Sequence, residues 1–196
     1  AIGLDSRIGP KFLTSGPGFG GSCFKKDILN LVYLCKHYNL NEVANFWQSV
    51  VDLNDWHQHR ISSLIIKKLF GTVSDKKICI LGFAFKANTN DTRESASIKI
   101  CKDLLKEGAI LYIHDPKVDS KQISKVLGEE KQKYKNNLEI DFNEYNSGAW
   151  IYTDNIFLGL EGADAVVILT EWSEYGEIDW KKAYKKMRSP SWVFDT

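Results

Sequence analysis

Long apolar runs, an excess of charge of one sign and clustered cysteines are all missing from this 196-residue sequence. No apolar stretch approaches the roughly 18 residues that a membrane-spanning helix needs. The formal net charge is only +1, which argues against electrostatic binding to nucleic acid or to a membrane surface. The four cysteines are far apart and lack the paired spacing of a zinc site. We therefore expect no metal centre, and reduced thiols in a cytoplasmic protein.

A glycine-rich turn precedes one of these cysteines. The glycines of residues 18–21 allow the chain to turn sharply and to approach a ligand, and Cys23 follows them closely. The next apolar run predicts a helix over residues 27–38, with Cys23 in or just before its first turn. A helix N-terminus stabilises a thiolate, and a spacing of four residues puts Asp27 on the same helix face. The pattern favours a nucleophile with a neighbouring acid–base or water-orienting group.

A structural role for Cys23 is the alternative. A free cysteine beside an aromatic residue such as Phe24 is commonly a small buried hydrophobe. The string Gly-Ser-Cys-Phe is also similar to the sequence around papain-type cysteines, but those proteases need a distant histidine and the flanking sequence does not continue their motif. The residues alone leave both a catalytic and a structural role open.

A long helical pattern follows. Apolar residues recur with helical spacing from about residue 41 to residue 70, and about 30 residues at 1.5 Å rise give roughly 45 Å. The stripe runs from Val43 to Leu69 and counts Asn54 among its positions. A helix of this length predicts a bridge between domains or a subunit interface, the alternative being an ordinary core helix with a kink near residues 52–54.

After residue 75 the pattern changes to strands that alternate with helices. Short apolar strands are expected at 77–81, 109–114, 165–169 and 192–194, and an amphipathic helix at 97–105. Such alternation predicts an α/β fold with a parallel sheet. The polar stretch 128–148 has little periodicity and is expected to be a surface insertion.

The segment after the first of these strands departs from a dinucleotide-binding fingerprint. Of the pattern G-x-G-x-x-G only Gly82 is present, and alanines at the other two positions would hinder the approach of a pyrophosphate. We expect a Rossmann-like sheet that does not bind NAD in the standard way. Lys86 could reach a phosphate and Phe83 or Phe85 could stack on a base, although a solvated lysine beside core aromatics is the simpler alternative. Asp115, at the end of the second strand, is interpreted as a turn residue.

In their order along the chain, these motifs resemble those of the UDP-glucose/GDP-mannose dehydrogenase family, above all the cysteine segment of the UDP-glucose 6-dehydrogenases. The similarity covers nearly the whole chain, is weakest at 119–150, and is carried by residues 1–3, 7–9, 18–27, 30–35, 80–86, 91–95, 115–118, 170–172 and 194–195. It implies an α/β fold in which residues 1–74 form a cysteine loop and central dimerisation helices and residues 75–196 form a Rossmann-like UDP-sugar-binding domain. It also implies that this chain is a fragment, without the N-terminal NAD-binding domain.

The resemblance implies an activity as well. It is the NAD-dependent oxidation of UDP-glucose to UDP-glucuronate through a thiohemiacetal and a thioester on Cys23, with Asp27 assisting proton transfer or positioning water. Substrate contacts are implied for Arg7, Phe12, Leu13, Thr14, Ser15, Gly16, Pro17, Gly18, Phe19, Gly20, Phe85 and Lys86. Arg7 would reach the substrate of a neighbouring subunit in a homodimer or larger homo-oligomer, and Arg93 would contact NAD held by the other domain.

Two features set the chain apart from the family pattern. Thr14 stands where animal enzymes commonly have a lysine, and the sequence stops before an arginine that the family uses for substrate. The resemblance also places the glycine-rich NAD domain and the family's catalytic lysine and glutamate upstream of this sequence, so the chain alone is expected to lack dehydrogenase activity. The alternatives are a sister dehydrogenase acting on another UDP- or GDP-sugar, and a non-catalytic module that binds a nucleotide sugar or dimerises.

Overall fold

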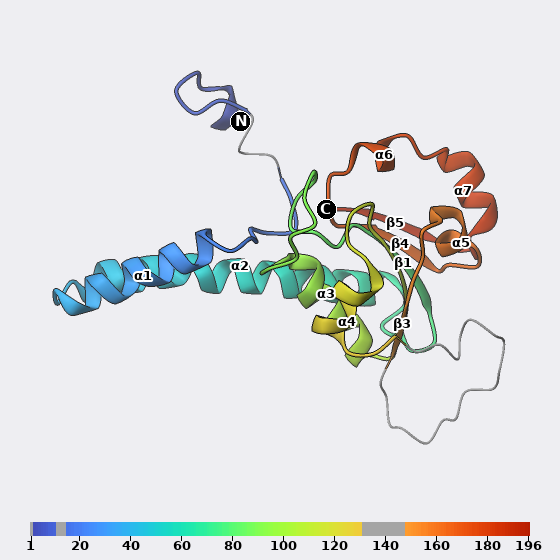
Figure 1. The fold of residues 1–196 in the computed structure, drawn as a ribbon, viewed down its shortest axis with the longest axis horizontal. Helices are drawn as coiled ribbons and strands as arrows, with labels where there is room; N and C mark the ends of the chain where they lie inside the picture. Colours follow the sequence, from blue (N-terminus) through green and yellow to red (C-terminus); the bar gives the residue numbers. More distant parts are fainter. Residues whose placement is uncertain (1, 11–14, 131–147) are drawn as a thin grey trace.

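A five-stranded parallel sheet forms the core of the computed structural model, which describes residues 2–10, 15–130 and 148–196 (Figure 1). Its strands are β1 (Lys77–Leu81), β2 (Ile110–His114), β3 (Ala149–Tyr152), β4 (Ala165–Ile168) and β5 (Trp192–Asp195). They lie in the order β3-β2-β1-β4-β5, all parallel. Residues 78–81 of the central strand are all buried, as the continuous apolar composition of a strand covered on both faces requires. The predicted α/β fold is confirmed.

One strand of the sheet was missed by the sequence prediction. β3 has only four residues and directly follows the polar stretch 128–148. Its apolar run is therefore too short to indicate a strand by its pattern. Its Ala149, Trp150 and Ile151 are nevertheless buried, and the strand pairs with β2. Most of the expected surface insertion, residues 131–147, lies outside the described residues.

Helices cover both faces of this sheet. The helices that follow β1 and β2 lie on one face and those that flank β4 lie on the other (Figure 1). They are α3 (Ala96–Lys106) and α4 (Ser120–Leu127) on the first face, and α5 (Ile156–Leu160), the short α6 (Ser173–Gly176) and α7 (Trp180–Lys186) after β3 and β4. Side chains of both layers, such as Ile100 and Leu160, meet in one core. The hydroxyl of Ser95 accepts a hydrogen bond from the N–H of Ser97 and so caps α3.

A helical hairpin extends away from the sheet (Figure 1). It consists of α1 (Phe24–His37) and α2 (Asn41–Lys68), preceded by a single 3-10 turn at Ile2–Leu4. Val32 and Ala44 belong to a small core between the two helices, whereas Ile65, near the other end of α2, joins the core of the sheet. With 28 residues, α2 is about 42 Å long, which confirms the predicted long helix. Its N-terminal half lies off the sheet, which favours the bridge or interface over the ordinary core helix.

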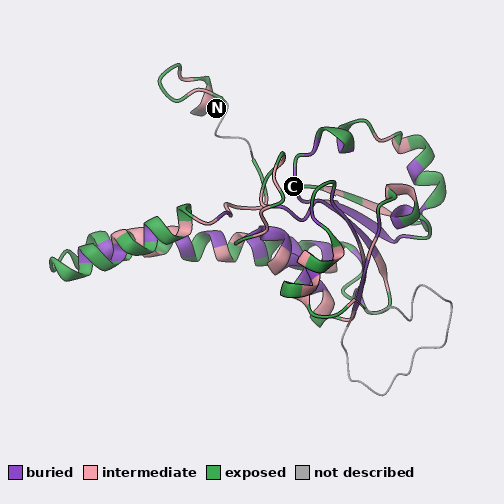
Figure 2. Ribbon diagram, viewed as in Figure 1, coloured by how far each residue is buried: buried purple, intermediate pink, exposed green. Residues whose placement is uncertain are grey.

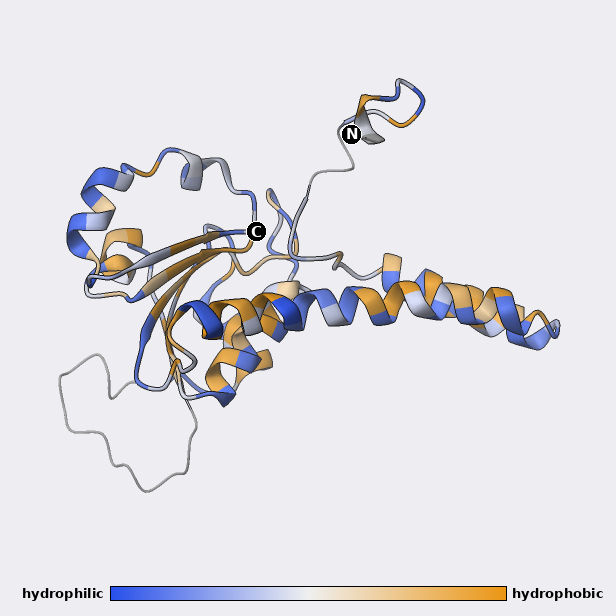
Figure 3. Ribbon diagram, turned by 180° about the vertical axis from the view of Figure 1, so that it is seen from behind, coloured by the Kyte–Doolittle hydropathy of each residue, from blue (hydrophilic) through white to orange (hydrophobic). Residues whose placement is uncertain are grey.

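Much of the hairpin is exposed in Figure 2, and it carries many hydrophobic residues in Figure 3. Phe46 and Leu53 keep 61% and 62% of their surface, and Trp56 keeps 57%. Phe46 and Leu53 are seven residues apart and therefore share one stripe of α2. A stripe of this kind is typical of an interaction surface.

Among the described helices, none combines the length and the apolar character needed to cross a bilayer.

Candidate active site

Cys23 occupies the N-cap position of α1. Its carbonyl oxygen accepts a hydrogen bond from the N–H of Asp27 at 2.8 Å, and both residues are exposed. The sulfur lies 3.5 Å from the hydroxyl of Ser22. The helix begins at Phe24 rather than at residue 27, and this places the thiol at the positive end of the helix dipole, where the glycine turn and the apolar run had predicted it.

Helix α2 holds the glycine-rich loop from one side. The N–H of Phe19 donates to Oδ1 of Asn54 at 2.9 Å, and Nδ2 of Asn54 donates to the carbonyl oxygen of Phe19 at 3.2 Å. Nε2 of His57 lies 3.2 Å from the carbonyl oxygen of Gly16. Gly18 has a φ of +120°, and a Cβ there would come within 2.6 Å of Asn54 Oδ1, so this position requires glycine. The sequence placed Asn54 in the buried stripe of this helix, where the structure has it, but did not predict that its side chain binds the loop.

The segment after β1 holds the same loop from the other side. The N–H of Gly21 donates to the carbonyl oxygen of Arg93 at 2.9 Å. A Cβ on Gly20 would lie 2.5 Å from the carbonyl oxygen of Glu94. A Cβ on Gly21 would lie 2.9 Å from the ring of Phe85. We call residues 15–23, which lead to Cys23, the cysteine loop. Its glycines let it pass closely between α2 and the residues that follow the carboxyl end of β1.

Ion pairs surround the place where the cysteine loop lies between α2 and the segment after β1. The sequence did not predict them. The ammonium of Lys25, in the first turn of α1, lies 2.9 Å from the carboxylate of Glu94 and 3.9 Å from that of Asp55. The Asp55 carboxylate also pairs with Lys99 of α3 at 2.9 Å. Partners this distant along the chain leave no local pattern in a sequence, so only the fold reveals them.

The three residues proposed for nucleotide contacts after β1 differ in exposure. Phe83 is fully buried in the core, so it cannot stack on a base. Phe85 is half-buried against Gly21 and keeps part of its ring exposed. Lys86 is exposed, and its Nζ lies 5.4 Å from the centroid of the Phe85 ring in a cation–π contact. Of the two aromatic residues, Phe85 is the one with surface left for a ligand.

The carboxylate of Asp115 binds the backbone amides that follow β1. Its Oδ2 accepts from the N–H groups of Phe83 at 2.7 Å and Ala84 at 3.0 Å. The same oxygen lies 3.2 Å from Nε1 of Trp172, which also donates to it. Its Oδ1 accepts from two N–H groups of the turn that follows the residue itself. The interpretation as a turn residue therefore covers two of these five contacts, and two of the others take up amides that a pyrophosphate would need.

Thr170 fills the crevice between the ends of β1 and β4. Gly82 has a φ of +96°, and a Cβ there would lie 2.4 Å from Cβ of Thr170. The hydroxyl of Thr170 donates to the carbonyl oxygen of Ala84 at 2.7 Å. Open α/β sheets hold nucleotides at this switch in strand order. NAD does not fit this position, because Asp115 occupies the backbone amides and Thr170 occupies the crevice that its pyrophosphate would need. The missing glycines of the fingerprint point the same way.

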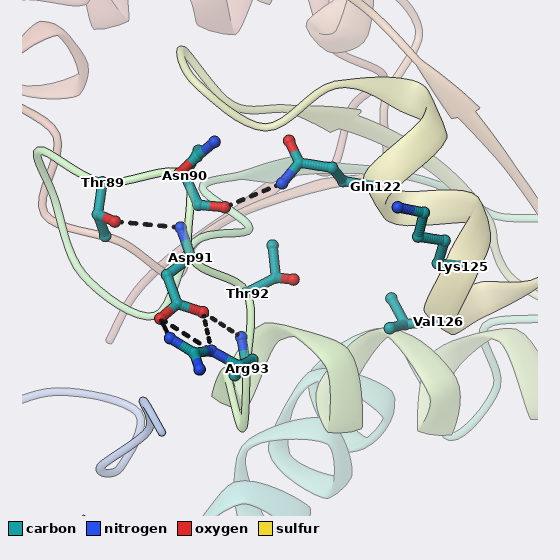
Figure 4. A pocket seen from close by; sticks show the side chains of 8 residues that line it. All are labelled: Thr89, Asn90, Asp91, Thr92, Arg93, Gln122, Lys125 and Val126. Carbon is teal, nitrogen blue, oxygen red and sulfur yellow. Dashed lines mark hydrogen bonds and ion pairs between the residues drawn. The ribbon is translucent and has the colours of Figure 1, made fainter. Parts of the chain in front are cut away.

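Arg93 lines a polar pocket of about 540 Å³ beside the loop (Figure 4). The pocket is lined by Thr89, Asn90, Asp91, Thr92, Arg93, Gln122, Lys125 and Val126. The guanidinium of Arg93 pairs with the carboxylate of Asp91 at 2.7 Å. Hydrogen bonds to Asp91 are the main cause that raises the pKa of Arg93, and the charge of Cys23 contributes to a smaller degree. Arg93 thus lies within electrostatic reach of Cys23 and at the edge of an open pocket.

The remaining residues predicted to contact substrate lie either away from the cysteine loop or directly before its glycines. Arg7 belongs to residues 2–10, which Figure 1 shows apart from the sheet, and its guanidinium pairs with Asp5 at 2.7 Å. Ser15 is exposed and Pro17 is half-buried ahead of the glycines. Three predicted residues lie outside the described residues: Phe12, Leu13 and Thr14. Within the described ranges, no three histidine, cysteine, aspartate or glutamate side chains are grouped so that they could hold a metal ion.

Comparison with known proteins assigns both parts of the chain to one family. Residues 79–196 match the UDP-binding domain, and residues 1–56 the central domain, of the UDP-glucose/GDP-mannose dehydrogenase family. The chain is 48% identical over 200 residues to UDP-glucose 6-dehydrogenase of Drosophila melanogaster, and 50% identical over 195 residues to that of Pongo abelii. All of this chain is covered in both alignments, but only 40% and 38% of the relatives, so the chain spans about two fifths of their length.

A solved structure shows the same similarity. The UDP-glucose dehydrogenase of the hyperthermophilic archaeon Pyrobaculum islandicum superposes with a TM-score of 0.72 at 26% identity, over 98% of this chain and 41% of that one.

Proposed function

Because the chain belongs to the UDP-glucose/GDP-mannose dehydrogenase family, we propose that it forms part of an NAD-dependent UDP-glucose 6-dehydrogenase, which oxidises UDP-glucose to UDP-glucuronate. One observation carries the proposal. It is the exposed thiol of Cys23 at the N-terminus of α1, on a loop fitted between α2 and the segment after β1. Near 50% identity to two UDP-glucose 6-dehydrogenases over the whole chain supports the choice of reaction.

In this proposal Cys23 is the nucleophile. Loss of a hydride from C6 and of the proton from its hydroxyl would turn the C6 alcohol into an aldehyde, with one NAD+ supplying the hydride acceptor. The Cys23 thiolate adds to this aldehyde, and the S–C bond that forms gives a thiohemiacetal. Loss of a second hydride and proton, with a second NAD+ as the acceptor, would give a thioester, and attack by water breaks the S–C bond, releases the carboxylate with a proton and returns the thiolate. The N-terminus of α1 favours the anionic sulfur. Asp27, exposed in the first turn of the same helix, assists proton transfer or positions the water.

The substrate contacts are proposed to come from the loop before the cysteine and from the segment after β1. Residues 15–20 would wrap the sugar and uridine, Phe85 offers a partly exposed ring, and the exposed ammonium of Lys86 suits a phosphate. Phe12, Leu13 and Thr14 are proposed to extend this loop. Arg7 belongs to residues 2–10, a segment that lies apart from the sheet (Figure 1), and is proposed to serve the site of a neighbouring subunit.

NAD is proposed as the cofactor, and when bound it supplies the hydride acceptor for the oxidation. The end of β1 does not fit it, because Asp115 and Thr170 occupy the amides and the crevice there. Arg93, exposed beside the loop, is proposed as an outlying contact for NAD held elsewhere in the enzyme.

Assembly and location complete the proposal. The apolar stripe of the α1–α2 hairpin is proposed to bind a second copy of the chain, with residues 1–74 as the cysteine loop and dimerisation region and residues 75–196 as the UDP-sugar domain. A cytoplasmic location is supported by the four free cysteines.

A panel of nucleotide sugars tests the substrate. An enzyme of the relatives' length that contains this chain is given NAD with UDP-glucose, UDP-galactose or GDP-mannose, and NADH formation is followed. UDP-glucose is expected to give the highest kcat/KM. Faster oxidation of another sugar would point to a sister dehydrogenase. No NADH with any of the three would favour a non-catalytic binding or dimerisation module.

A further inference from the structure

One buried side chain connects helix α2 to the cysteine loop. Asn54 lies in the middle of α2 and is only 8% exposed. Burying an amide is costly unless its donor and acceptor are both satisfied. Here Oδ1 accepts from the N–H of Phe19 and Nδ2 donates to the carbonyl oxygen of the same residue. The side chain therefore binds both backbone polar groups of a single loop residue, as a neighbouring strand would.

The surrounding contacts show that this junction is closely fitted. Gly18, directly before Phe19, leaves no room for a Cβ against Asn54. One helical turn further along α2, His57 reaches the carbonyl oxygen of Gly16. The loop is thus held at residues 16–19 by α2, while the next two glycines rest on the segment after β1.

The loop needs such an anchor because of its composition. Glycines leave the backbone many accessible conformations, and the segment between Phe19 and Cys23 contains two of them. Nucleophilic attack requires the sulfur to be held near its target, and a displacement of about 1 Å can cost a factor of about 100 in rate. The contacts of Asn54 are the ones that remove this freedom on the side of α2.

We propose that Asn54 is the positioning residue for Cys23: it binds the backbone of Phe19 and so fixes the loop that carries the thiol to the long helix. The inference rests on the proposed function of Cys23 as nucleophile. Asn54 itself is buried behind the loop and acts through Phe19.

Amide hydrogen exchange on this chain tests the anchor directly. Asn54→Leu removes both hydrogen bonds at similar volume, whereas Asn54→Asp keeps an acceptor for the N–H of Phe19. Exchange at Phe19 is expected to be at least about tenfold faster in Asn54→Leu and only partly restored in Asn54→Asp, which keeps the acceptor but loses the donor to the Phe19 carbonyl oxygen. The matched control is Gln48→Leu, on the same helix but bonded to Asp52, which should leave Phe19 unchanged. Unchanged exchange at Phe19 in Asn54→Leu would refute the anchor.

Kinetics in an enzyme of the relatives' length test the positioning role. Asn54→Leu is expected to lower kcat at least about tenfold and to change KM for UDP-glucose less, with partial rescue in Asn54→Asp. Continued protection of residues 61–69 from exchange would show that the fold is intact. Faster exchange at Phe19 with an unchanged kcat would overturn the proposal. If the unsubstituted enzyme oxidises no nucleotide sugar, the proposed function fails, and with it the positioning role, while the exchange result still decides whether Asn54 holds the loop.

Discussion

At the scale of single residues, Cys23 differs from the other three cysteines in what surrounds its sulfur. Cys35, Cys79 and Cys101 are buried, and burial raises the pKa of Cys79 to about 12 and that of Cys101 as well. A buried neutral thiol is a poor nucleophile. Cys23, in contrast, is exposed at the N-terminus of a helix.

Replacing Cys23 tests its chemistry. In an enzyme of the relatives' length, Cys23→Ser is expected to abolish net formation of the carboxylate while leaving UDP-glucose binding within a few-fold, because a hydroxyl is a much weaker nucleophile at neutral pH. Product analysis and a binding titration measure the two effects. Cys35→Ala, inside the hairpin, is the control and should retain oxidation. Near-normal turnover to the carboxylate in Cys23→Ser would refute covalent thioester chemistry at this site.

His114 should make the stability of the fold depend on pH. Burial lowers the pKa of this histidine, and the neighbouring carboxylates of Glu174 and Asp115 oppose the shift only in part. Its Nδ1 lies 3.0 Å from the hydroxyl of Tyr175. Below the ordinary histidine pKa of about 6.5, the unfolded chain takes up a proton that the folded chain resists, so the free energy of unfolding should fall as the pH drops from about 7 to about 5.

Urea unfolding at pH 5, 6, 7 and 8, in wild type and in His114→Gln, measures this dependence. One proton contributes at most about 1.4 kcal/mol per pH unit, and the variant should lose that part of the slope. Titratable groups that do not interact with His114 contribute equally to both proteins, so the difference between the two slopes is assigned to His114 together with the neighbouring carboxylates of Glu174 and Asp115. Identical slopes would contradict the assignment.

The sequence predicts some of these residues and misses others for physical reasons. Cys23 could be found because glycines, a helix start and an acidic residue occur within ten positions of each other. Asn54 could not, because its partner Phe19 is 35 residues away and one polar residue hardly weakens an apolar stripe. Asp115 was recognised only by its local turn, since its contacts to the amides after β1 span more than thirty residues.

At the scale of elements, the α1–α2 hairpin carries apolar surface that its own chain leaves exposed. The predicted length of α2 followed from a sustained helical period, which is among the strongest signals in a sequence. β3 gave no comparable signal, because four residues beside a polar stretch contain barely one alternation. The exposure of Phe46 and Leu53 required the fold, since periodicity alone does not say which partner covers a stripe.

This stripe should drive self-association. The chain is expected to form a two-fold dimer, and Phe46→Glu with Leu53→Glu should shift it to the monomer, because each carboxylate would have to be buried without a partner. Light scattering over a concentration series measures the change. Asn45→Glu, exposed on the same helix outside the stripe, is the control and should remain dimeric. A wild-type chain that is monomeric at every accessible concentration would contradict the prediction.

At the scale of the whole molecule, the sheet retains the strand order of a nucleotide-binding fold. The position at which such a sheet binds its nucleotide, between the ends of β1 and β4, is filled by side chains of the chain itself. Asp115 and Thr170 satisfy the groups at the ends of β1 and β4 from within the chain. To the side of this position the glycines of the cysteine loop lie against Phe85, and the ammonium of Lys86 lies over the ring of Phe85. The missing glycines predicted the loss of the standard site, whereas the side chains that replace the ligand could be identified only in three dimensions.

Calorimetric titration of this chain should therefore distinguish two ligands. UDP-glucose is expected to bind weakly and NAD more weakly still or not at all. A hydrogen bond to a charged group is worth about 1.5–3 kcal/mol, so the loss of one such contact should lower the affinity tenfold or more. Lys86→Ala should weaken the binding of UDP-glucose further, and Lys181→Ala, exposed on α7, serves as its control. Clear binding of NAD without binding of UDP-glucose would overturn the assignment of residues 75–196.

Helix α2 should tolerate substitutions better than insertions or deletions, because one continuous helix connects the contact with the cysteine loop to the contact with the sheet. Asn54 meets the cysteine loop on one side of the helix, and Ile65 enters the core of the sheet about three turns later. An insertion of one residue between them would rotate one contact relative to the other by about 100° and shift it by about 1.5 Å. No repacking of side chains could absorb such a change of phase. Within this interval the helix should accept substitutions one at a time, whereas insertions and deletions would detach either the thiol's loop or the sheet.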